Sequence, residues 1–184
     1  MATVSPSEVL ALALAREPTL AGGRLICVDG PAGSGKTTLA AGLAALDPRS
    51  VVVNTDKLLD GWGGLPALPP LLGALVAPLA RGEASSYRRY DWVAGRYAGR
   101  VPVPRTPLLV IEGVGAGSRL LAPYRTLLVW VSAPDDERLR RVVERDGPGV
   151  EPHLRQWFLD EAEHFAAEGT STAADLRVAT PAGL

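Results

Sequence analysis

Apolar residues along this chain of 184 residues gather in short runs, separated by longer stretches of mixed polarity. Five runs read as strands, at 24–28, 51–54, 108–111, 126–131 and 175–179. The middle three are apolar at almost every position, which is typical of strands covered on both faces. Because long segments separate the runs, we predict parallel strands joined by crossovers, in an α/β fold with a five-stranded parallel sheet.

Three segments outside these runs are predicted to contain helices. Leucines recur at helical spacing over 38–46, and the prolines at 69 and 70 indicate a helix over 69–80. Ser5 to Ala15 has the same spacing but no basic start and no long apolar run, so we interpret residues 1–20 as an N-terminal docking helix, not a leader.

Polar residues follow the strands where each strand ends. They are Asn54-Thr55-Asp56 after the second strand, Glu112-Gly113 after the third and Ser132 to Asp135 after the fourth. In a parallel sheet the ligand lies at the carboxyl ends of the strands. These residues are therefore expected to face a common ligand.

The composition indicates one globular domain over 1–184, with 47% hydrophobic and 21% charged residues. A formal net charge of −1 argues against a non-specific nucleic-acid binder, and nothing approaches a membrane span. Cys27, the single cysteine, lies in a predicted buried strand, which suits an inert core thiol and a reducing cytoplasm. The sequence leaves a homodimer open.

The segment Gly30-Pro31-Ala32-Gly33-Ser34-Gly35-Lys36-Thr37 fits the phosphate-binding loop pattern. It lies between a predicted strand and a predicted helix, the context in which such a loop binds a nucleoside triphosphate. The chain has seventeen arginines but only two lysines, Lys36 and Lys57. A chain that uses arginine almost everywhere has a lysine in the phosphate loop, where a compact point charge is needed. The expected nucleotide contacts are Gly30, Ala32, Gly33, Ser34, Gly35, Lys36, Thr37 and Thr38.

Two carboxylates are candidates for the chemistry beside that loop. Asp56 is the candidate base that accepts a proton from an acceptor hydroxyl, or it holds Mg²⁺ through water; the alternative is an N-cap of the next helix. Glu112 precedes Gly113 and suits Mg²⁺ beside the nucleotide phosphates, together with the Thr37 hydroxyl. Its alternative is an N-cap or a partner for an arginine.

An arginine-rich helix is expected after the acidic residues 135–137. At about 100° per residue, Arg138, Arg141 and Arg145 fall on one side, from which they could reach the transferring phosphoryl group together. The alternative for each arginine is an ordinary surface ion pair. Because Asp146-Gly147-Pro148-Gly149 breaks the helix, we predict a lid region over 138–152.

The segment Tyr87-Arg88-Arg89-Tyr90-Asp91-Trp92 suits a polar acceptor. Its aromatic rings give flat contact area, Asp91 could bind hydroxyls and the arginines could hold an anionic group. An edge strand with ordinary cross-strand aromatic packing is the alternative.

Taken in order, these residues resemble the P-loop kinases grouped around uridine kinase, phosphoribulokinase and pantothenate kinase. The resemblance spans most of the chain and rests on the phosphate loop, Asp56, Tyr90-Asp91-Trp92, Glu112-Gly113 and the stretch from Glu137 to Asp146. It implies a three-layer P-loop fold with a helical lid, Asp56 as base, and Arg141 and Arg145 as lid groups. It also implies that Tyr90 and Asp91 contact the acceptor and that Thr180-Pro181-Ala182 lies near the adenine.

The sequence departs from this family in its acceptor region. Where the uridine kinases have a His and an Arg after Tyr-Asp-Phe, this chain has Val93-Ala94-Gly95-Arg96, with no His and a shifted Arg. Lys57-Leu58-Leu59 replaces an aromatic position after Asp56, and Trp62 is the nearest aromatic residue. Arg96 and Trp92 join the expected acceptor contacts.

The function predicted from these residues is transfer of phosphate from ATP, with Mg²⁺, to a hydroxyl of a small metabolite, with a nucleoside as the first acceptor. Two alternatives remain: a nucleotide-dependent switch or accessory protein, and an ATP-binding domain without turnover. A guanine switch is disfavoured because no Asn-Lys-X-Asp sequence occurs.

Overall fold

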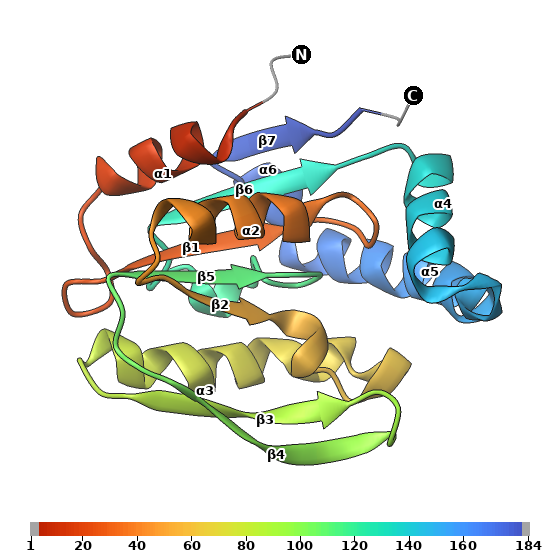
Figure 1. The fold of residues 1–184 in the computed structure, drawn as a ribbon, viewed down its shortest axis with the longest axis horizontal. Helices are drawn as coiled ribbons and strands as arrows, with labels where there is room; N and C mark the ends of the chain where they lie inside the picture. The colour runs from red at the N-terminus through yellow and green to blue at the C-terminus, as the bar shows by residue number, and fades with distance from the viewer. Residues whose placement is uncertain (1–3, 182–184) are drawn as a thin grey trace.

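A five-stranded parallel sheet forms the centre of the protein, as the computed structural model of residues 4–181 shows (Figure 1). The strand order is β2-β5-β1-β6-β7. The strands are β1 (Arg24–Asp29), β2 (Val51–Asn54), β5 (Leu108–Glu112), β6 (Leu127–Ser132) and β7 (Leu176–Ala179). The predicted α/β fold and parallel sheet are confirmed, and every predicted strand is found within one residue of its predicted bounds.

Each face of the sheet packs against its own set of helices, because alternate residues of a strand point to opposite faces. Ile26 and Val28 of β1 face α1 (Pro6–Leu14) and α2 (Lys36–Leu46). Leu25 and Cys27 face the other way, toward α3 (Leu68–Ala80) and α5 (Glu151–Glu168). The result is the three-layer arrangement expected from the sequence.

Helix α1 is the N-terminal helix that the sequence predicts. Ser5 and Glu8 form a capping box at its start, where Pro6 occupies the first turn. At its other end the Arg24 guanidinium donates to the carbonyl oxygens of Ala13 and Arg16, both at 3.0 Å. These bonds join the helix to the first strand.

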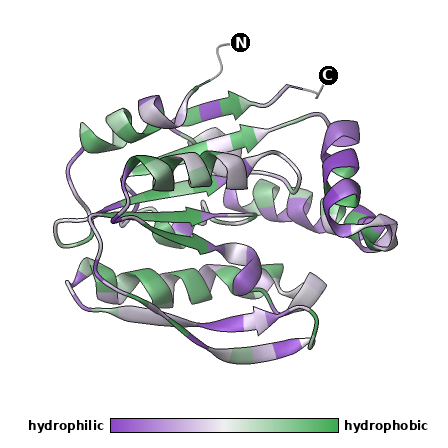
Figure 2. Ribbon diagram, in the orientation of Figure 1, coloured by the Kyte–Doolittle hydropathy of each residue, from purple (hydrophilic) through white to green (hydrophobic). Residues whose placement is uncertain are grey.

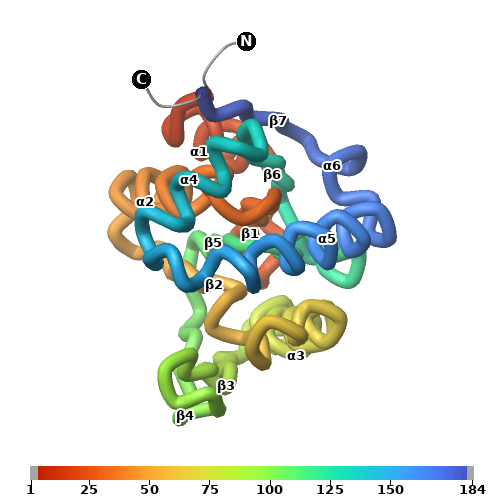
Figure 3. Tube along the Cα trace, turned by 90° about the vertical axis from the view of Figure 1, so that its right-hand side faces the viewer, coloured from red at the N-terminus to blue at the C-terminus, as the bar shows by residue number. Residues whose placement is uncertain are grey.

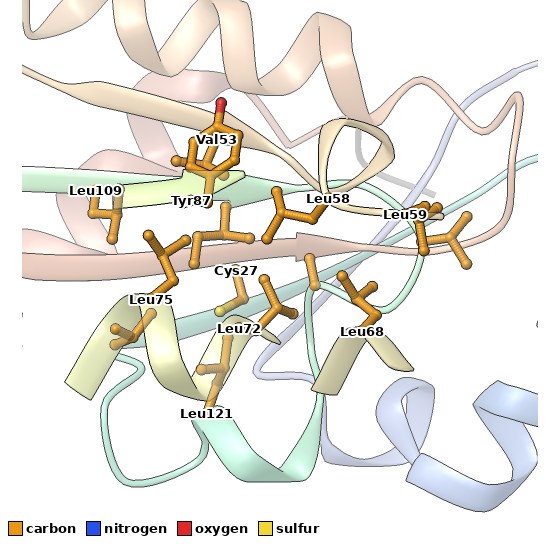
Figure 4. Close-up of a cluster of buried hydrophobic side chains, with 14 of the residues drawn as sticks. Cys27, Val53, Leu58, Leu59, Leu68, Leu72, Leu75, Tyr87, Leu109 and Leu121 are labelled. Carbon is orange, nitrogen blue, oxygen red and sulfur yellow. The ribbon is translucent and has the colours of Figure 1, made fainter. Parts of the chain in front are cut away.

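The connection between β2 and β5 contains an additional layer. After α3 the chain forms an antiparallel hairpin of β3 (Ser85–Asp91) and β4 (Arg96–Val103), which Figure 3 shows beside α3 and away from the central sheet. Tyr87 and Val103 of the hairpin reach the core, and Figure 4 shows Tyr87 among leucines of α3 and Val53 of β2. Residues 87–91 are thus part of a strand, as one interpretation of the sequence proposed, and Trp92 begins the hairpin turn; the partner strand β4 was not predicted.

The lid region predicted from the sequence, 138–152, contains most of α4 (Asp135–Asp146) and the start of α5. Helix α4 is mostly hydrophilic, in contrast to α3 and the sheet (Figure 2). Gly147, with φ +89°, ends α4, and a short 3₁₀ turn, Pro148–Val150, leads into α5. The sequence did not predict α5, whose few apolar residues stand among charged ones. A single short helix, α6 (Thr170–Ala173), precedes β7.

None of the helices within residues 4–181 combines the length and the apolar character that crossing a membrane requires.

Candidate functional site

A cavity of about 900 Å³ opens at the carboxyl ends of the strands, where ligands bind in parallel sheets. Figure 3 looks onto this end, with α4 and α5 crossing in front of the sheet. The phosphate loop, the segments after β2 and β5, the helices α4 and α5, and the tip of the β3–β4 hairpin all contribute to its lining. The N-terminal residues Val4 and Pro6 also reach it.

The phosphate loop needs glycine because other parts of the chain approach its backbone closely. Gly30 has φ +141°, and a Cβ there would lie 2.0 Å from the Val131 carbonyl oxygen. At Gly33, with φ +77°, a Cβ would lie 2.5 Å from the Arg138 carbonyl oxygen. Any side chain at either position would displace β6 or α4 from the loop.

Lys36 begins α2 and is almost fully buried. Its ammonium group donates to the Pro31 carbonyl oxygen at 2.8 Å. This bond joins the last part of the phosphate loop to its first part. Burial lowers the pKa of Lys36, while the carboxylates of Asp29, Asp56 and Glu112 act against that shift. A cation held among carboxylates at a loop of backbone N–H groups is suited to a polyphosphate.

Glu112 and Thr37 meet beside the loop. The Thr37 hydroxyl donates to Glu112 Oε1 at 3.2 Å, and Asn54 donates to the same oxygen through its side-chain amide. Strand register explains this meeting, since Glu112 pairs with both Asn54 of β2 and Val28 of β1. Burial raises the pKa of Glu112, and Lys36 opposes that rise.

Asp56 lies in the turn after β2, with its side chain open to the cavity. Asn54, not Asp56, caps the short 3₁₀ helix Thr55–Lys57: its side chain accepts from the Asp56 N–H at 2.8 Å. The Asp56 carboxylate is therefore not used as a helix cap. Protein atoms surrounding it raise its pKa by desolvation, with Lys36 and Arg145 opposing.

Thr37, Asp56 and Glu112 offer the oxygen atoms that Mg²⁺ prefers beside phosphates. Within residues 4–181, no cluster of three or more His, Cys, Asp or Glu side chains forms a metal cage. That donor set suits Mg²⁺, which usually takes one or two carboxylates and completes its shell with substrate phosphates and water.

The lid arginines lie on different sides of the site, which corrects the expectation that three of them face the phosphates together. Arg138 is buried away from the cavity, where it pairs with Glu161 and donates to the Ala32 carbonyl oxygen. Arg141 and Arg145 do line the cavity. Arg145 pairs with Asp146 at 2.7 Å.

Arg141 joins the lid helix to two loops. It donates to the carbonyl oxygens of Gly33 at 3.2 Å and Pro181 at 2.7 Å, and to the Thr180 hydroxyl at 3.0 Å. Pro181 therefore lies beside the lid helix and Thr180 beside the phosphate loop. Ala182, the third residue predicted near the adenine, lies outside the described residues.

The remaining predicted nucleotide contacts divide between the surface and the interior of the loop. Ala32, Gly35 and Thr38 line the cavity. Gly30 and Ser34 do not: Ser34 is fully buried, and its hydroxyl has no hydrogen-bond partner. The N–H of Ala32 is already bonded to the Glu161 carboxylate at 2.9 Å.

Two buried carboxylates that support the loop were not predicted from the sequence. Asp29, fully buried at the end of β1, accepts from the N–H groups of Gly30, Gly115 and Gly117 at 2.7 to 2.9 Å. Burial raises its pKa to about 6, against these bonds and the charge of Lys36. Glu161 comes from α5, which no sequence signal connects with the loop.

The predicted acceptor residues do not gather in the cavity. Trp92 lines it, but Tyr90, Asp91 and Arg96 do not. Asp91 accepts from the N–H groups of Val93 and Ala94 in the hairpin turn, which lowers its pKa. Arg96 is exposed and pairs with Asp91 in the strand register. The hairpin turn therefore uses Asp91, and we do not assign it to the acceptor.

Other aromatic residues line the cavity near the hairpin tip. Trp62 and Trp157 line it together with Trp92. Trp62 had a weak sequence signal, as the first aromatic residue after Asp56, whereas Trp157 of the unpredicted α5 had none. Trp92 also donates from its indole N–H to the Asp56 carbonyl oxygen at 2.9 Å, so the hairpin tip supports the turn that carries Asp56.

Comparisons with known proteins agree with this architecture. A scan against models of protein families finds no match. Among curated proteins, uridine-cytidine kinase C of Dictyostelium discoideum is 27% identical over 142 residues, which are 70% of this chain. The chain spans about a third (32%) of the length of that relative.

Among the solved structures that match, two cover nearly the whole chain. A provisionally assigned uridine kinase from Bacillus stearothermophilus is 18% identical, with a TM-score of 0.65 and coverage of 94% of this chain and 96% of its own. A provisionally assigned fructose transport system kinase from a Silicibacter species is 23% identical, with a TM-score of 0.66 and coverage of 95% and 98%.

The fold is therefore that of the P-loop kinases grouped around uridine kinase, as the sequence resemblance predicted. In sequence, the chain is similar to uridine-cytidine kinase C of Dictyostelium discoideum.

Proposed function

We propose that this chain transfers the γ-phosphoryl group of ATP to a hydroxyl of a small molecule. One observation carries the proposal: the Asp56 carboxylate, the Thr37–Glu112 pair and Lys36 face one cavity at the carboxyl ends of adjacent strands. A triphosphate loop alone serves many activities, whereas a carboxylate across the cavity from it provides a base for an acceptor hydroxyl.

In this proposal the acceptor oxygen attacks the γ-phosphorus, and the bond from that phosphorus to the bridging oxygen of ADP breaks. Asp56 accepts the hydroxyl proton. Lys36 offsets charge on the β- and γ-phosphates, and Arg141 and Arg145 approach them from α4. Bound Mg²⁺, held through Thr37 and Glu112, would neutralise phosphate charge.

The whole chain acts as one domain in this proposal, and the lid region 138–152 excludes water as it moves over the cavity. Gly147 and the turn that follows it give that region a point at which to bend. Nucleosides are the first acceptors to test, because the Dictyostelium relative is named a uridine-cytidine kinase.

A screen of ADP release over nucleosides, sugars and other alcohols tests the proposal. We expect acceptor-dependent ADP release, removed by Asp56→Asn and by Lys36→Ala. Only Lys36→Ala should also weaken ATP binding, measured by calorimetry. Lys57→Ala, the change at the other lysine, is the matched control and should keep full activity.

Tight ATP binding without transfer to any acceptor would contradict the proposal, and would favour a nucleotide-binding protein without turnover. An Asp56→Asn variant that keeps the kcat of the unaltered protein would contradict the role of Asp56 alone.

A further inference from the structure

Three of the four tryptophans of the chain line the acceptor side of the cavity. Trp62 lies between the other two, with ring centroids 5.4 Å from Trp92 and 5.8 Å from Trp157. They come from the segment after β2, the hairpin tip and α5, so distant parts of the chain converge here. We call Trp62, Trp92 and Trp157 the tryptophan wall.

Aliphatic side chains line the cavity together with the tryptophan wall. Four of them pack in one apolar cluster with Trp62 and Trp157: Leu59, Val114, Val150 and Leu154. Their side chains have no hydrogen-bond donor or acceptor for the edge of a nucleobase or the hydroxyls of a sugar. Polar ligand groups placed against them would lose water without compensation.

The cations that line the cavity, Lys36, Arg141 and Arg145, are the ones that the proposed function assigns to the nucleotide phosphates. Arg145 pairs with Asp146, Arg141 binds Glu137 and three oxygen atoms of the loops, and Lys36 binds the Pro31 carbonyl oxygen. Asp56 adds a negative charge on the acceptor side. An acceptor with its own carboxylate or phosphate would therefore find repulsion here, not a partner.

The ring geometry favours a flat ligand over a cation. Trp62 meets Trp92 and Trp157 edge to face, at 74° and 73°, and stacks on His153 at 13°. Rings packed in this way fill the space between them, whereas an ammonium cage needs several ring faces around an open point. The wall therefore offers an apolar surface on which another ring can lie.

We infer that the acceptor is an uncharged alcohol with a flat, apolar ring system, which lies on the tryptophan wall while its hydroxyl reaches Asp56. This inference rests on the proposed phosphoryl transfer and names its substrate class. It departs from a nucleoside acceptor, because Tyr90, Asp91 and Arg96, the predicted polar contacts, lie outside the cavity lining.

Three probes with one primary hydroxyl each separate the classes: 2-(2-naphthyl)ethanol is flat and apolar, uridine is flat and polar, and choline is cationic. Calorimetric titration into the protein saturated with Mg²⁺ and a non-hydrolysable ATP analogue measures binding, and ADP release with ATP measures transfer. We expect the naphthyl alcohol to bind most tightly and to give the highest kcat/KM.

Variants of the wall test where the ring lies. Trp62→Leu should raise the Kd of the naphthyl alcohol about three- to tenfold, the size of one aromatic contact, and leave the Kd of the ATP analogue unchanged. Trp92→Leu, at a 41% exposed residue, is a second variant with less risk to folding. Trp130→Phe changes the one tryptophan outside the cavity lining and should alter neither constant.

The outcomes distinguish this inference from the proposed function. Phosphorylation of uridine or choline in preference to the naphthyl alcohol overturns the inference and leaves phosphoryl transfer standing. If the naphthyl alcohol binds in a way that depends on Trp62, but no probe and no alcohol of the wider screen is phosphorylated, the wall is supported and the kinase proposal is overturned. Equal effects of the wall variants and Trp130→Phe overturn the assignment to the wall.

Discussion

Thr180, just after β7, joins the phosphate loop to the lid helix through one hydroxyl group. The hydroxyl donates to the Ser34 carbonyl oxygen at 2.9 Å and accepts from Arg141 at 3.0 Å. Thr180→Val keeps the shape of the side chain, including the methyl group that lies next to Gly35, and removes both bonds. We expect it to weaken both folding and nucleotide binding.

The expected loss follows from the two bonds. A neutral hydrogen bond contributes about 1 kcal/mol, and a bond to a charged donor contributes more when it is buried. Because the Arg141 side chain is partly exposed, we assign about 1 kcal/mol to that bond as well, a total of about 2 kcal/mol. For a chain of this size, that corresponds to a fall in Tm of about 4–8 °C.

Nucleotide affinity should change with stability because the loop must be held in its binding conformation. If about half of the 2 kcal/mol serves that purpose, the Kd for MgATP rises about fivefold. Urea unfolding measures the first effect, and calorimetric titration with a non-hydrolysable ATP analogue measures the second.

Thr106 provides a matched control for this measurement. Its hydroxyl also makes bonds to main-chain carbonyl oxygens, of Arg49 at 2.7 Å and Leu108 at 3.0 Å, but at the opposite end of the sheet. Thr106→Val should lower the free energy of unfolding by a similar amount and leave the Kd unchanged. If the two variants change the Kd equally, or if Thr180→Val changes neither quantity, the reasoning is refuted.

Three further predictions concern buried or enclosed charges and a buried thiol. Asp56→Asn should lower kcat by about 10²–10⁴ without weakening ATP binding. In the unaltered protein, activity should fall tenfold per pH unit below the raised pKa of Asp56, because only the ionised carboxylate accepts a proton; the residual activity of Asp56→Asn should lack this acidic limb in a pH–rate profile. Arg138→Met should lower the free energy of unfolding in urea by about 3–5 kcal/mol, because it leaves the Glu161 carboxylate buried without its partner, and Glu161→Gln in addition should restore more than half of that loss. Cys27, whose burial raises its pKa to about 12, should resist iodoacetamide at pH 8 until the protein is unfolded, as mass spectrometry would detect.

The central sheet was predictable because its strands are apolar on both faces and end in polar residues. The entirely apolar run from Leu108 to Ile111 predicts a buried strand. Glu112 directly follows this run and is therefore expected at the carboxyl end of the strand, where the ligand lies. The local sequence pattern was sufficient where a feature depends only on neighbouring residues. The phosphate loop is such a feature, because its glycines and its lysine all lie within eight consecutive residues.

The acceptor side was not predictable in the same way, because it depends on contacts between distant segments. Trp157 is 95 residues from Trp62 in the sequence and 5.8 Å from it in ring centroids. Arg138 shares a side of α4 with Arg141, but the approach of α5 places Glu161 against it and holds it in the interior. Asp91 satisfies a family pattern, yet the hairpin turn uses its carboxylate. The partners of these side chains are set by tertiary packing, which cannot be predicted from helical or strand periodicity.

The hairpin, α3 and Trp62 all belong to the single excursion between β2 and β5, two strands that are neighbours in the sheet. The phosphate loop, Glu112 and Arg141 lie outside that excursion. In the function and the acceptor class proposed above, recognition of the acceptor and activation of the nucleotide are thus largely encoded in separate stretches of the chain. Exchange of residues 57–105 between proteins of this fold should therefore transfer the preference for the acceptor. Trp157 of α5 lies outside the exchanged segment but contacts it, so this residue would have to be matched to the new segment.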